Sequence, residues 1–301
     1  MPCIAPLQGW KHKVHGGFTG TRQLAVLDAP LTVPCQKCIS CRLEKSRQWA
    51  IRCDHENKMH DYGMFLTLTY DDQHLPPGQT LERSHVPSFF KRLRRRRPRL
   101  RIFYCGEYGE TTLRPHYHAL VWGWEPPDKT SLKNSKGKTI YESQIINDKW
   151  GHGHCNFGDI TFESAAYVAR YTTKKITGAP AADHYQTFNN ETGEIFWRLP
   201  EFSGSSRRPG IGIPFLAKYF QDIYAKDQII VRGRAMRPPL AYDRWLKEHH
   251  FDLWESVMER RREHIPPTID DEQSRYKKGF NHAKARTKIL EQKLQKRDQH
   301  S

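Results

Sequence analysis

The apolar residues of this 301-residue chain follow two kinds of pattern. Short runs of bulky and β-branched residues are typical of strands, and the run at 63–70 is apolar enough to lie in the middle of a sheet. Apolar residues at three- and four-residue steps instead indicate helices with one buried face. The predicted strands cover residues 24–27, 63–70, 101–105, 114–122 and 156–161, and the predicted helices cover residues 38–60, 84–93, 162–176, 215–224 and 240–264.

The predicted helix at 162–176 has two faces. Thr161 is suited to cap its first turn, as Ser84 is for an earlier helix, and Gly178 and Pro180 end the pattern. One face is slim and apolar and is expected to pack on a sheet: Phe162, Ala166, Ala169, Thr173 and Ile176. The other face holds Ser164, Tyr167, Tyr171 and Lys174. Because the two tyrosines are four residues apart, their phenols lie about one turn apart. The alternative is that both tyrosines are half-buried and only pack.

Two histidines lie two residues apart in one of the predicted strands. Because residues i and i+2 of a strand share a face, the imidazoles of His116 and His118 point the same way and offer two ligands for a metal. Glu107 is the nearest good candidate for a third ligand, because a glycine turn would bring its strand back beside the histidines. Glu110 lies close enough to compete with it. The alternative is a chance pair in a chain with 16 histidines.

A second H-x-H pair, His152 and His154, lies between glycines. No acidic residue comparable to Glu107 is near this pair in the sequence. We therefore interpret these two residues as surface histidines without a metal.

Three of the seven cysteines, Cys35, Cys38 and Cys41, follow a C-x-x-C-x-x-C pattern. This spacing is typical of a tetrahedral zinc–thiolate site, for which Cys3 or Cys53 could supply the fourth ligand. The alternative is three partly buried thiols at the start of a helix. An odd number of cysteines in a chain without a visible secretory signal favours metal binding or free thiols over disulfides.

Lysine and arginine (49) outnumber aspartate and glutamate (33), which gives a formal charge of +16. Eight of the eleven residues at 91–101 are Lys or Arg, and none is acidic. Such like charges repel each other unless an anionic partner neutralises them, so we expect a nucleic-acid backbone to bind here. The alternative is a solvated surface. The residues predicted to bind DNA are Arg94, Arg95, Arg96 and Arg97, with Arg207 and Arg208 in a turn-rich loop.

The sequence argues against a membrane protein. No apolar run is long enough to span a bilayer. The first residues also lack the basic and apolar regions of a secretory signal. We therefore expect no membrane partner.

The metal ligands, the tyrosines and the basic runs together suggest chemistry on a phosphodiester. A phenol has a pKa of about 10, so covalent catalysis by tyrosine needs an activated electrophile. A divalent metal held by the two histidines and Glu107 could polarise a scissile phosphate. Lys174, on the face of the tyrosines, could pair with the resulting phosphotyrosine.

Three motifs resemble those of the HUH nuclease superfamily. Residues 65–70 (Phe-Leu-Thr-Leu-Thr-Tyr) resemble its first motif, residues 106–118 its metal motif, and residues 167–174 its double-tyrosine motif. The histidines precede the tyrosines, which is the order of replication initiators, whereas the related relaxases have the reverse order. Tyr117 departs from the pattern, because the superfamily usually has an aliphatic residue between the histidines.

Within the superfamily, the chain is similar to the replication initiators of small single-stranded DNA bacteriophages, the microviruses of the gokushovirus branch. Residues 34–41 and 207–212 also resemble that branch. The resemblance implies an α+β fold in which a central antiparallel sheet is flanked by helices, with the Cys-cluster segment at the N-terminus. A basic helical tail is expected at the C-terminus, either as a solvated helix or as an arm that orders on DNA.

The resemblance also implies a function. The expected activity is nicking and joining of single-stranded DNA at the phage origin through a 5′-phosphotyrosine, followed by rolling-circle synthesis by host helicase and polymerase in the bacterial cytoplasm. Catalysis would fall to Tyr167, Tyr171 and Lys174. The expected cofactor is Mg²⁺ or Mn²⁺, and the histidines suit Mn²⁺ better than Mg²⁺. The expectation of a structural Zn²⁺ at the cysteines comes from their spacing and not from the resemblance.

Two other functions are compatible with parts of the sequence. A non-catalytic, zinc-dependent DNA- or RNA-binding protein would explain the charge and the cysteines, with the tyrosines stacking on bases. A nuclease that uses water would cut without a covalent adduct. The expected segments are an N-terminal Cys-cluster segment (1–60), a nuclease core (61–178), a basic and aromatic helical extension (179–265) and a basic tail (266–301).

Overall fold

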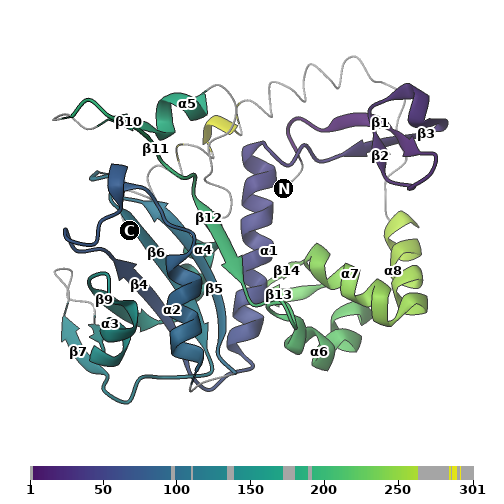
Figure 1. Cartoon of the computed structure of the whole chain (residues 1–301). Coiled ribbons are helices and arrows are strands. Elements are labelled where there is room, and N and C mark those ends of the chain that lie inside the picture. Colours follow the sequence, from purple (N-terminus) through teal and green to yellow (C-terminus); the bar gives the residue numbers. More distant parts are fainter. Residues whose placement is uncertain are drawn as a thin grey trace. The chain divides into compact units, whose positions relative to one another are not determined.

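The computed structural model describes residues 3–95, 99–109, 111–133, 139–171, 180–188, 192–263, 285, 287–289 and 292, without the side chains of residues 171 and 180 (Figure 1). The chain divides into two compact units, one of residues 46–259 and one of residues 1–45 with 260–301. The helices are α1 (Ile39–Asn57), α2 (His85–Arg94), α3 (Gln144–Trp150), α4 (Phe162–Tyr171), α5 (Pro180–Tyr185), α6 (Ile213–Ala225), α7 (Leu240–His249) and α8 (Phe251–Glu263), with short 3-10 turns η1 (Arg22–Leu24) and η2 (Pro77–Gln79). The strands are β1 (Leu7–His12), β2 (Phe18–Thr19), β3 (Ala25–Val33), β4 (Gly63–Thr69), β5 (Arg101–Tyr108), β6 (Pro115–Trp122), β7 (Thr130–Lys133), β8 (Thr139–Glu142), β9 (Cys155–Asp159), β10 (Gln186–Phe188), β11 (Ile195–Trp197), β12 (Phe202–Ser205), β13 (Ile229–Val231) and β14 (Arg234–Met236).

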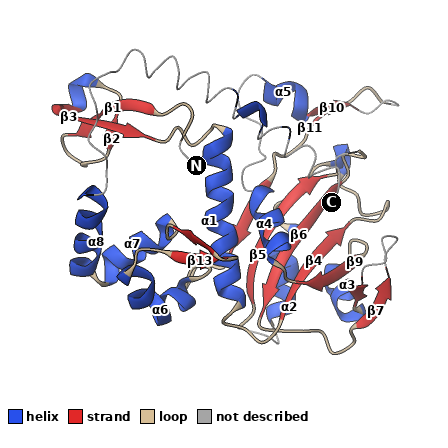
Figure 2. Ribbon diagram, turned by 180° about the vertical axis from the view of Figure 1, so that it is seen from behind, coloured by secondary structure: helices blue, strands red, loops and turns tan. Residues whose placement is uncertain are grey.

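A seven-stranded antiparallel sheet forms the centre of the larger unit. Its strand order is β12-β5-β6-β4-β9-β8-β7, so the histidine strand β6 lies between β5 and β4. Figure 2 shows this sheet in red with helices around it. The predicted α+β class with a central antiparallel sheet is therefore confirmed.

The two faces of the sheet belong to separate hydrophobic clusters. Strand β4 alternates between buried and half-buried residues, which directs Met64, Leu66 and Leu68 to one face. That face packs on α2 and α3 through residues such as Phe89 and Trp150. The opposite face packs on α4 and on the second half of α1; the buried members of that cluster are Cys53, Phe103, Cys105, Leu120, Trp122, Ala165, Val168, Ala169 and Ile211. Each core strand thus presents alternate residues to two cores.

Two local predictions about helices need correction. Ser84 was expected to cap α2, but its backbone is helical and its hydroxyl donates to Glu82 instead of accepting from the helix. Of the predicted apolar stripe of α4, Ala169 is buried as expected, whereas Phe162 and Ala166 are only half-buried. Ala165 and Val168 are buried in their place, so the packing face is rotated by part of a turn. The Thr161 cap is confirmed, since its hydroxyl oxygen accepts from the Ser164 amide at 3.1 Å. Thr173, Ile176 and Gly178 lie outside the described residues.

Helix α1 is fixed to the rest of the larger unit by a buried carboxylate. Glu56 is fully buried, forms an ion pair with Arg101 at the start of β5, and shares a hydrogen bond with His60 at 3.1 Å. It also accepts from the backbone amide of Gly212 at 2.7 Å. Burial opposes the charged form, but these hydrogen bonds outweigh it and lower the pKa of Glu56. One side chain therefore connects α1, β5 and the loop before α6.

A third cluster joins Ile51 of α1 to α6, α7, α8 and the β13–β14 hairpin. Within it, His55 is buried, stacks on Phe215 with ring centroids 4.0 Å apart, and shares a 2.9 Å hydrogen bond with the Tyr242 hydroxyl. Burial lowers the pKa of His55 to about 4; Lys58 lowers it further, and Asp54 opposes this effect. The folded protein thus favours the neutral imidazole.

This histidine predicts a loss of stability in mild acid. An unfolded histidine has a pKa of about 6.5, so between that value and pH 4 the unfolded chain binds more protons and stability falls as the pH falls. We expect His55 alone to remove about 2 kcal/mol from the free energy of unfolding between pH 7 and pH 5. Denaturant titrations of the wild type and of His55→Asn at both pH values measure this difference. An equal pH dependence of the two proteins would contradict the prediction.

The smaller unit contains a three-stranded antiparallel sheet of order β2-β1-β3. Leu7 pairs with Val33, so the start of β1 lies beside the end of β3. Among residues 3–38, only Gly9, Thr19 and Ala25 are buried. This sheet therefore has almost no hydrophobic core. In the described part of the chain, no helix has the length and apolar character needed to cross a membrane.

Candidate active site

Strand pairing brings the three predicted metal ligands together. Glu107 on β5 is directly opposite His116 on β6, and His118 follows two residues later on the same face. The Nε2 atoms of His116 and His118 lie 3.3 Å and 2.8 Å from one Glu107 oxygen, Oε1. One ligand atom from each residue lies within 4.8 Å of the others. The antiparallel register thus gathers residues that are up to eleven positions apart in sequence.

The outer nitrogens of both histidines have hydrogen-bond partners. His116 Nδ1 lies 3.2 Å from the backbone oxygen of Arg114, and His118 Nδ1 lies 3.1 Å from Thr67 Oγ1 on β4. A carbonyl oxygen only accepts, so His116 Nδ1 is the donor in its contact with Arg114. Such outer contacts orient the rings of metal-binding histidines.

The charge state of the group favours a cation. Burial alone would raise the pKa of Glu107, but hydrogen bonds from His116 and His118 outweigh it and lower the pKa to about 2. Burial lowers the pKa of His118, against the attraction of Glu107. A charged carboxylate oxygen and two imidazole nitrogens thus lie at short distance from one another, which is a mixed set of oxygen and nitrogen ligands. The residues present therefore fit a divalent metal with nitrogen and oxygen ligands.

Helix α4 places Tyr167 beside this group. The Tyr167 hydroxyl donates to Glu107 Oε1 at 3.4 Å, the same atom that both histidines approach. Its ring contacts His118 edge-on, with centroids 5.2 Å apart, and Phe65 of β4 edge-on at 6.3 Å. Phe65 in turn stacks on His118 at 5.1 Å. The phenol is therefore held over the histidines by aromatic contacts from two elements.

The structure gives no side-chain contacts for two other residues of the predicted tyrosine motif, Tyr171 and Lys174. Tyr171 is the last residue of α4, so its backbone continues the helix one turn beyond Tyr167. Lys174 lies outside the described residues, as does Glu110, the competitor of Glu107. The roles of Tyr171 and Lys174 stay predictions.

Two residues of this site lie in the 65–70 motif but had no individual role in the sequence prediction. Thr67 holds the outer nitrogen of His118, and Phe65 stacks on the ring of the same histidine. Both alternate with the buried residues of β4, so they point to the site face. The alternation of these residues with Leu66 and Leu68 can be read from the sequence. It does not show that β6, which carries the histidines, is the neighbouring strand.

The second histidine pair has a different environment. His152 stacks on His85 with centroids 4.3 Å apart and also contacts Trp150. His154 is exposed, and its backbone oxygen accepts from Thr69. Neither residue belongs to a group of metal-ligand side chains among the described residues. His152 is half-buried in an aromatic cluster and is therefore less exposed than expected.

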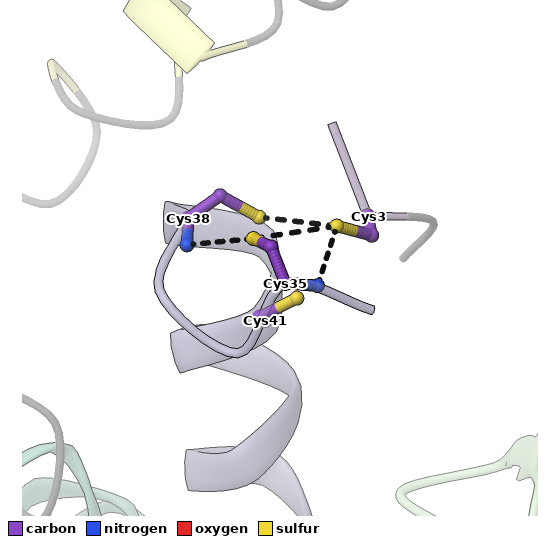
Figure 3. Close-up of side chains that lie close together, drawn as sticks. All are labelled: Cys3, Cys35, Cys38 and Cys41. Atoms are coloured by element: carbon purple, nitrogen blue, oxygen red, sulfur yellow. Dashed lines mark hydrogen bonds between the residues drawn. The ribbon is translucent and has the colours of Figure 1, made fainter. Parts of the chain in front are cut away.

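The cysteine motif forms a second group of ligand atoms, in the smaller unit. The Sγ atoms of Cys35, Cys38 and Cys41 converge with that of Cys3 (Figure 3), each within 4.8 Å of the others. Cys53, the other candidate for the fourth position, is buried instead in the cluster behind the large sheet. The cysteine group and the Glu107 group are the two sets of described residues that could hold a metal ion.

Several predicted DNA-binding arginines line one cavity at the other end of β5. This cavity has a volume of about 620 Å³, and its basic lining residues are Arg94, Arg99, Arg101, Arg207 and Arg208. The Arg94 guanidinium already has partners within the protein, because it donates to the Leu100 oxygen and to the Ser206 hydroxyl. Arg207 and Arg208 are exposed. Arg95 is exposed but does not line the cavity, and Arg96 and Arg97 lie outside the described residues.

Comparison with known proteins gives consistent matches. A family model described as "Replication-associated protein ORF2/G2P" matches residues 63–176. The chain is 33% identical over 267 residues to the replication-associated protein VP4 of Bdellovibrio phage phiMH2K, covering 84% of this chain and 80% of that protein. It is 30% identical over 295 residues to the replication-associated protein ORF2 of Spiroplasma virus 4, covering 86% of each. It is 32% identical over 230 residues to the replication-associated protein ORF4 of Chlamydia phage 1, covering 71% of this chain and 53% of that protein.

No solved structure is significantly similar to the chain. The matched model spans both the histidine strand and α4, and two phage proteins match over more than four fifths of this chain. The chain therefore belongs to the replication-associated (Rep) proteins of small single-stranded DNA bacteriophages of the microvirus type.

Proposed function

We propose that this protein nicks and rejoins single-stranded DNA at the phage origin and so starts rolling-circle replication. The observation that carries the proposal is the convergence of two imidazole nitrogens and the Tyr167 phenol on one oxygen of Glu107. The residues proposed to bind a divalent cation thus lie beside the proposed nucleophile. The names of the phage relatives support a role in replication.

In the proposed reaction, the oxygen of Tyr167 or Tyr171 attacks the phosphorus of the scissile phosphodiester. The bond from the phenol oxygen to phosphorus forms, and the bond from phosphorus to the 3′ oxygen breaks. The phenol loses its proton and the departing 3′ oxygen gains one, which leaves a 5′-phosphotyrosine and a free 3′-OH. Attack by a 3′-OH in the reverse direction joins strands and frees the tyrosine.

The side chains of the site have distinct parts in this proposal. A divalent cation held by Glu107, His116 and His118, either Mn²⁺ or Mg²⁺, would neutralise charge on the scissile phosphate. Glu107 and the His118 ring keep the Tyr167 phenol beside that position. Lys174 would pair with the phosphotyrosine. A host polymerase would then extend the free 3′-OH while a host helicase unwinds the duplex, in the bacterial cytoplasm.

A covalent-adduct assay tests this function. Oligonucleotides that tile the viral strand are labelled at the 3′ end and incubated with protein, with and without Mn²⁺. We expect one of them to transfer its label to the protein only when Mn²⁺ is present, because the adduct retains the 3′ fragment. Cleavage without labelled protein would indicate a nuclease that uses water. Binding without cleavage of any oligonucleotide would indicate a non-catalytic binder, such as the zinc-dependent one.

The arginine cavity gives a prediction about DNA binding. Each phosphate contact to single-stranded DNA contributes about 0.7 to the slope of log affinity against log salt concentration. We expect Arg207→Ala with Arg208→Ala to weaken binding of all sequences and to reduce the slope by about 1.4. Fluorescence anisotropy at several salt concentrations measures both effects.

The matched control removes the same charge elsewhere in the larger unit. Lys218 and Lys226 are exposed on and just after α6, and neither lines the cavity. Their double alanine variant should keep most of the slope. Equal losses in the two double variants would mean that net charge, rather than the cavity, attracts the DNA.

A further inference from the structure

The four sulfur atoms of the cysteine group have the spacing of a metal–thiolate site. Cys3 Sγ lies 3.5 Å from Cys35 Sγ and 3.7 Å from Cys38 Sγ, and Cys41 Sγ completes the group (Figure 3). Zinc–sulfur bonds of about 2.3 Å in a tetrahedron place sulfur atoms about 3.8 Å apart. The sulfurs of a disulfide are much closer, at about 2.05 Å. All four residues have free thiols.

The backbone around the group also favours thiolates. The amide of Cys35 donates to Cys3 Sγ at 3.3 Å, and the amide of Cys38 donates to Cys35 Sγ at 3.3 Å. Cys38 directly precedes α1, so its thiol lies at the helix N-terminus, where the helix dipole favours negative charge. The backbone amides therefore help to orient the sulfur atoms of Cys3 and Cys35 within the group.

The cysteine group lies at one end of the three-stranded sheet of the smaller unit. Cys3 precedes β1 and Cys35 follows β3, and the pairing of Leu7 with Val33 brings these two ends of the sheet together. The sheet between them buries almost no apolar side chain. A small sheet without a hydrophobic core is usually held by disulfides or a metal.

We propose that Cys3, Cys35, Cys38 and Cys41 bind one structural Zn²⁺, which clamps the open end of the β1–β3 sheet to the start of α1. Four thiolates close the tetrahedron and leave no position for a substrate, so the ion is structural rather than catalytic. Zinc binding is then coupled to folding of this segment. The site is separate from the Glu107 group, and the proposal does not depend on the nicking activity.

Metal analysis of the full-length protein, purified without chelators, tests the proposal. We expect about one zinc per chain, and after replacement with Co²⁺ an absorption spectrum with thiolate charge-transfer bands and visible bands of a tetrahedral ion. Cys35→Ser and Cys38→Ser should each reduce the zinc content to near zero. Cys53→Ala and Cys155→Ala, which change buried cysteines outside the group, should retain it.

Hydrogen exchange distinguishes a clamp from adventitious binding. Removal of zinc from the wild-type protein by a chelator should increase amide exchange in residues 7–33 at least about tenfold, while β4 and β6 keep their protection. If the serine variants are insoluble, Cys3→Ser, which leaves three thiolates, should release zinc to a chelator faster than the wild type.

Three results would overturn the proposal. The first is substoichiometric zinc in the wild-type protein. The second is zinc content that survives Cys35→Ser or falls equally in Cys53→Ala. The third is a disulfide among the four cysteines, found by mass spectrometry after alkylation of the purified protein under non-reducing conditions.

Discussion

Replacement of both Tyr167 and Tyr171 with phenylalanine is expected to abolish the covalent adduct with single-stranded DNA. The phenol oxygen is the proposed nucleophile, and phenylalanine keeps the ring contacts with Phe65 and His118 while it removes only that atom. Loss of a nucleophile lowers a rate by at least about a thousandfold. DNA binding and Mn²⁺ binding should stay close to wild type. The adduct assay, anisotropy and calorimetry measure the three quantities.

The single variants separate the two tyrosines. We expect Tyr167→Phe and Tyr171→Phe each to keep some adduct, because either phenol can attack in a single turnover. Joining after a second cleavage should suffer in both, since it needs one tyrosine free while the other is occupied. Trypsin cuts after Arg170, so the two tyrosines fall on different peptides, and mass spectrometry shows which one carries the nucleotide.

Tyr62 provides a matched control. Its side chain is exposed and follows α1, outside the described contacts of Glu107, so Tyr62→Phe should leave adduct formation unchanged. An adduct that survives in the double variant would place the nucleophile on another residue. An adduct lost in Tyr62→Phe as well would point to a general effect of the substitutions on folding.

His118→Ala is expected to reduce metal-dependent cleavage by at least about a thousandfold. Charge stabilisation by a metal ion is worth several kcal/mol, and each 1.36 kcal/mol corresponds to a tenfold change in rate. The substitution removes the proposed nitrogen ligand, which is buried and lies 2.8 Å from Glu107 Oε1, and also a ring that packs on Tyr167. His116→Ala should show a similar loss. Binding of DNA should persist, because the exposed arginines of the cavity line the other end of β5.

The control for the histidines lies in the loop between α3 and β9. His152→Ala with His154→Ala removes a second H-x-H pair that belongs to no ligand group among the described residues, and it should leave cleavage within about threefold of wild type. Glu107→Gln keeps the volume of the side chain and should weaken Mn²⁺ binding, measured by calorimetry. Loss of cleavage in the His152 and His154 variant, with activity retained in His118→Ala, would show that the wrong histidines were assigned.

Patterns of local sequence predicted the strands and the helix that carry the candidate site, and the resemblance supplied their arrangement in an antiparallel sheet. The apolar run at 63–70 predicted β4 as a central strand, the bulky and β-branched run at 114–122 predicted β6, and Thr161 marked the start of α4. The H-x-H spacing predicted that two imidazoles share a face, and the turn after β5 predicted a carboxylate beside them. The structure brings these residues together, while their roles in catalysis stay predictions.

Long-range pairing could not be predicted from local patterns. Strand β12 is short and polar, and its place beside β5 depends on residues about one hundred positions away, so no periodic signal marks it. The arginine cavity and the hydrogen bonds of Glu56 also depend on segments that are far apart in the sequence. The choice of Cys3 over Cys53 also depends on tertiary structure, because both residues satisfied the sequence rule.

Tyr117, between the two histidines, faces the opposite core. Its hydroxyl shares a 2.8 Å hydrogen bond with Tyr70, accepts from the Glu82 amide at 2.8 Å and donates to the Glu82 oxygen at 3.0 Å. An aliphatic residue, usual at this position in the superfamily, would leave the backbone amide and oxygen of the half-buried Glu82 without this partner. Residues 116–118 therefore cannot be replaced alone by the corresponding residues of a superfamily member with an aliphatic residue at position 117. A functional graft would have to transfer the 80–82 loop behind the sheet together with the motif in front of it.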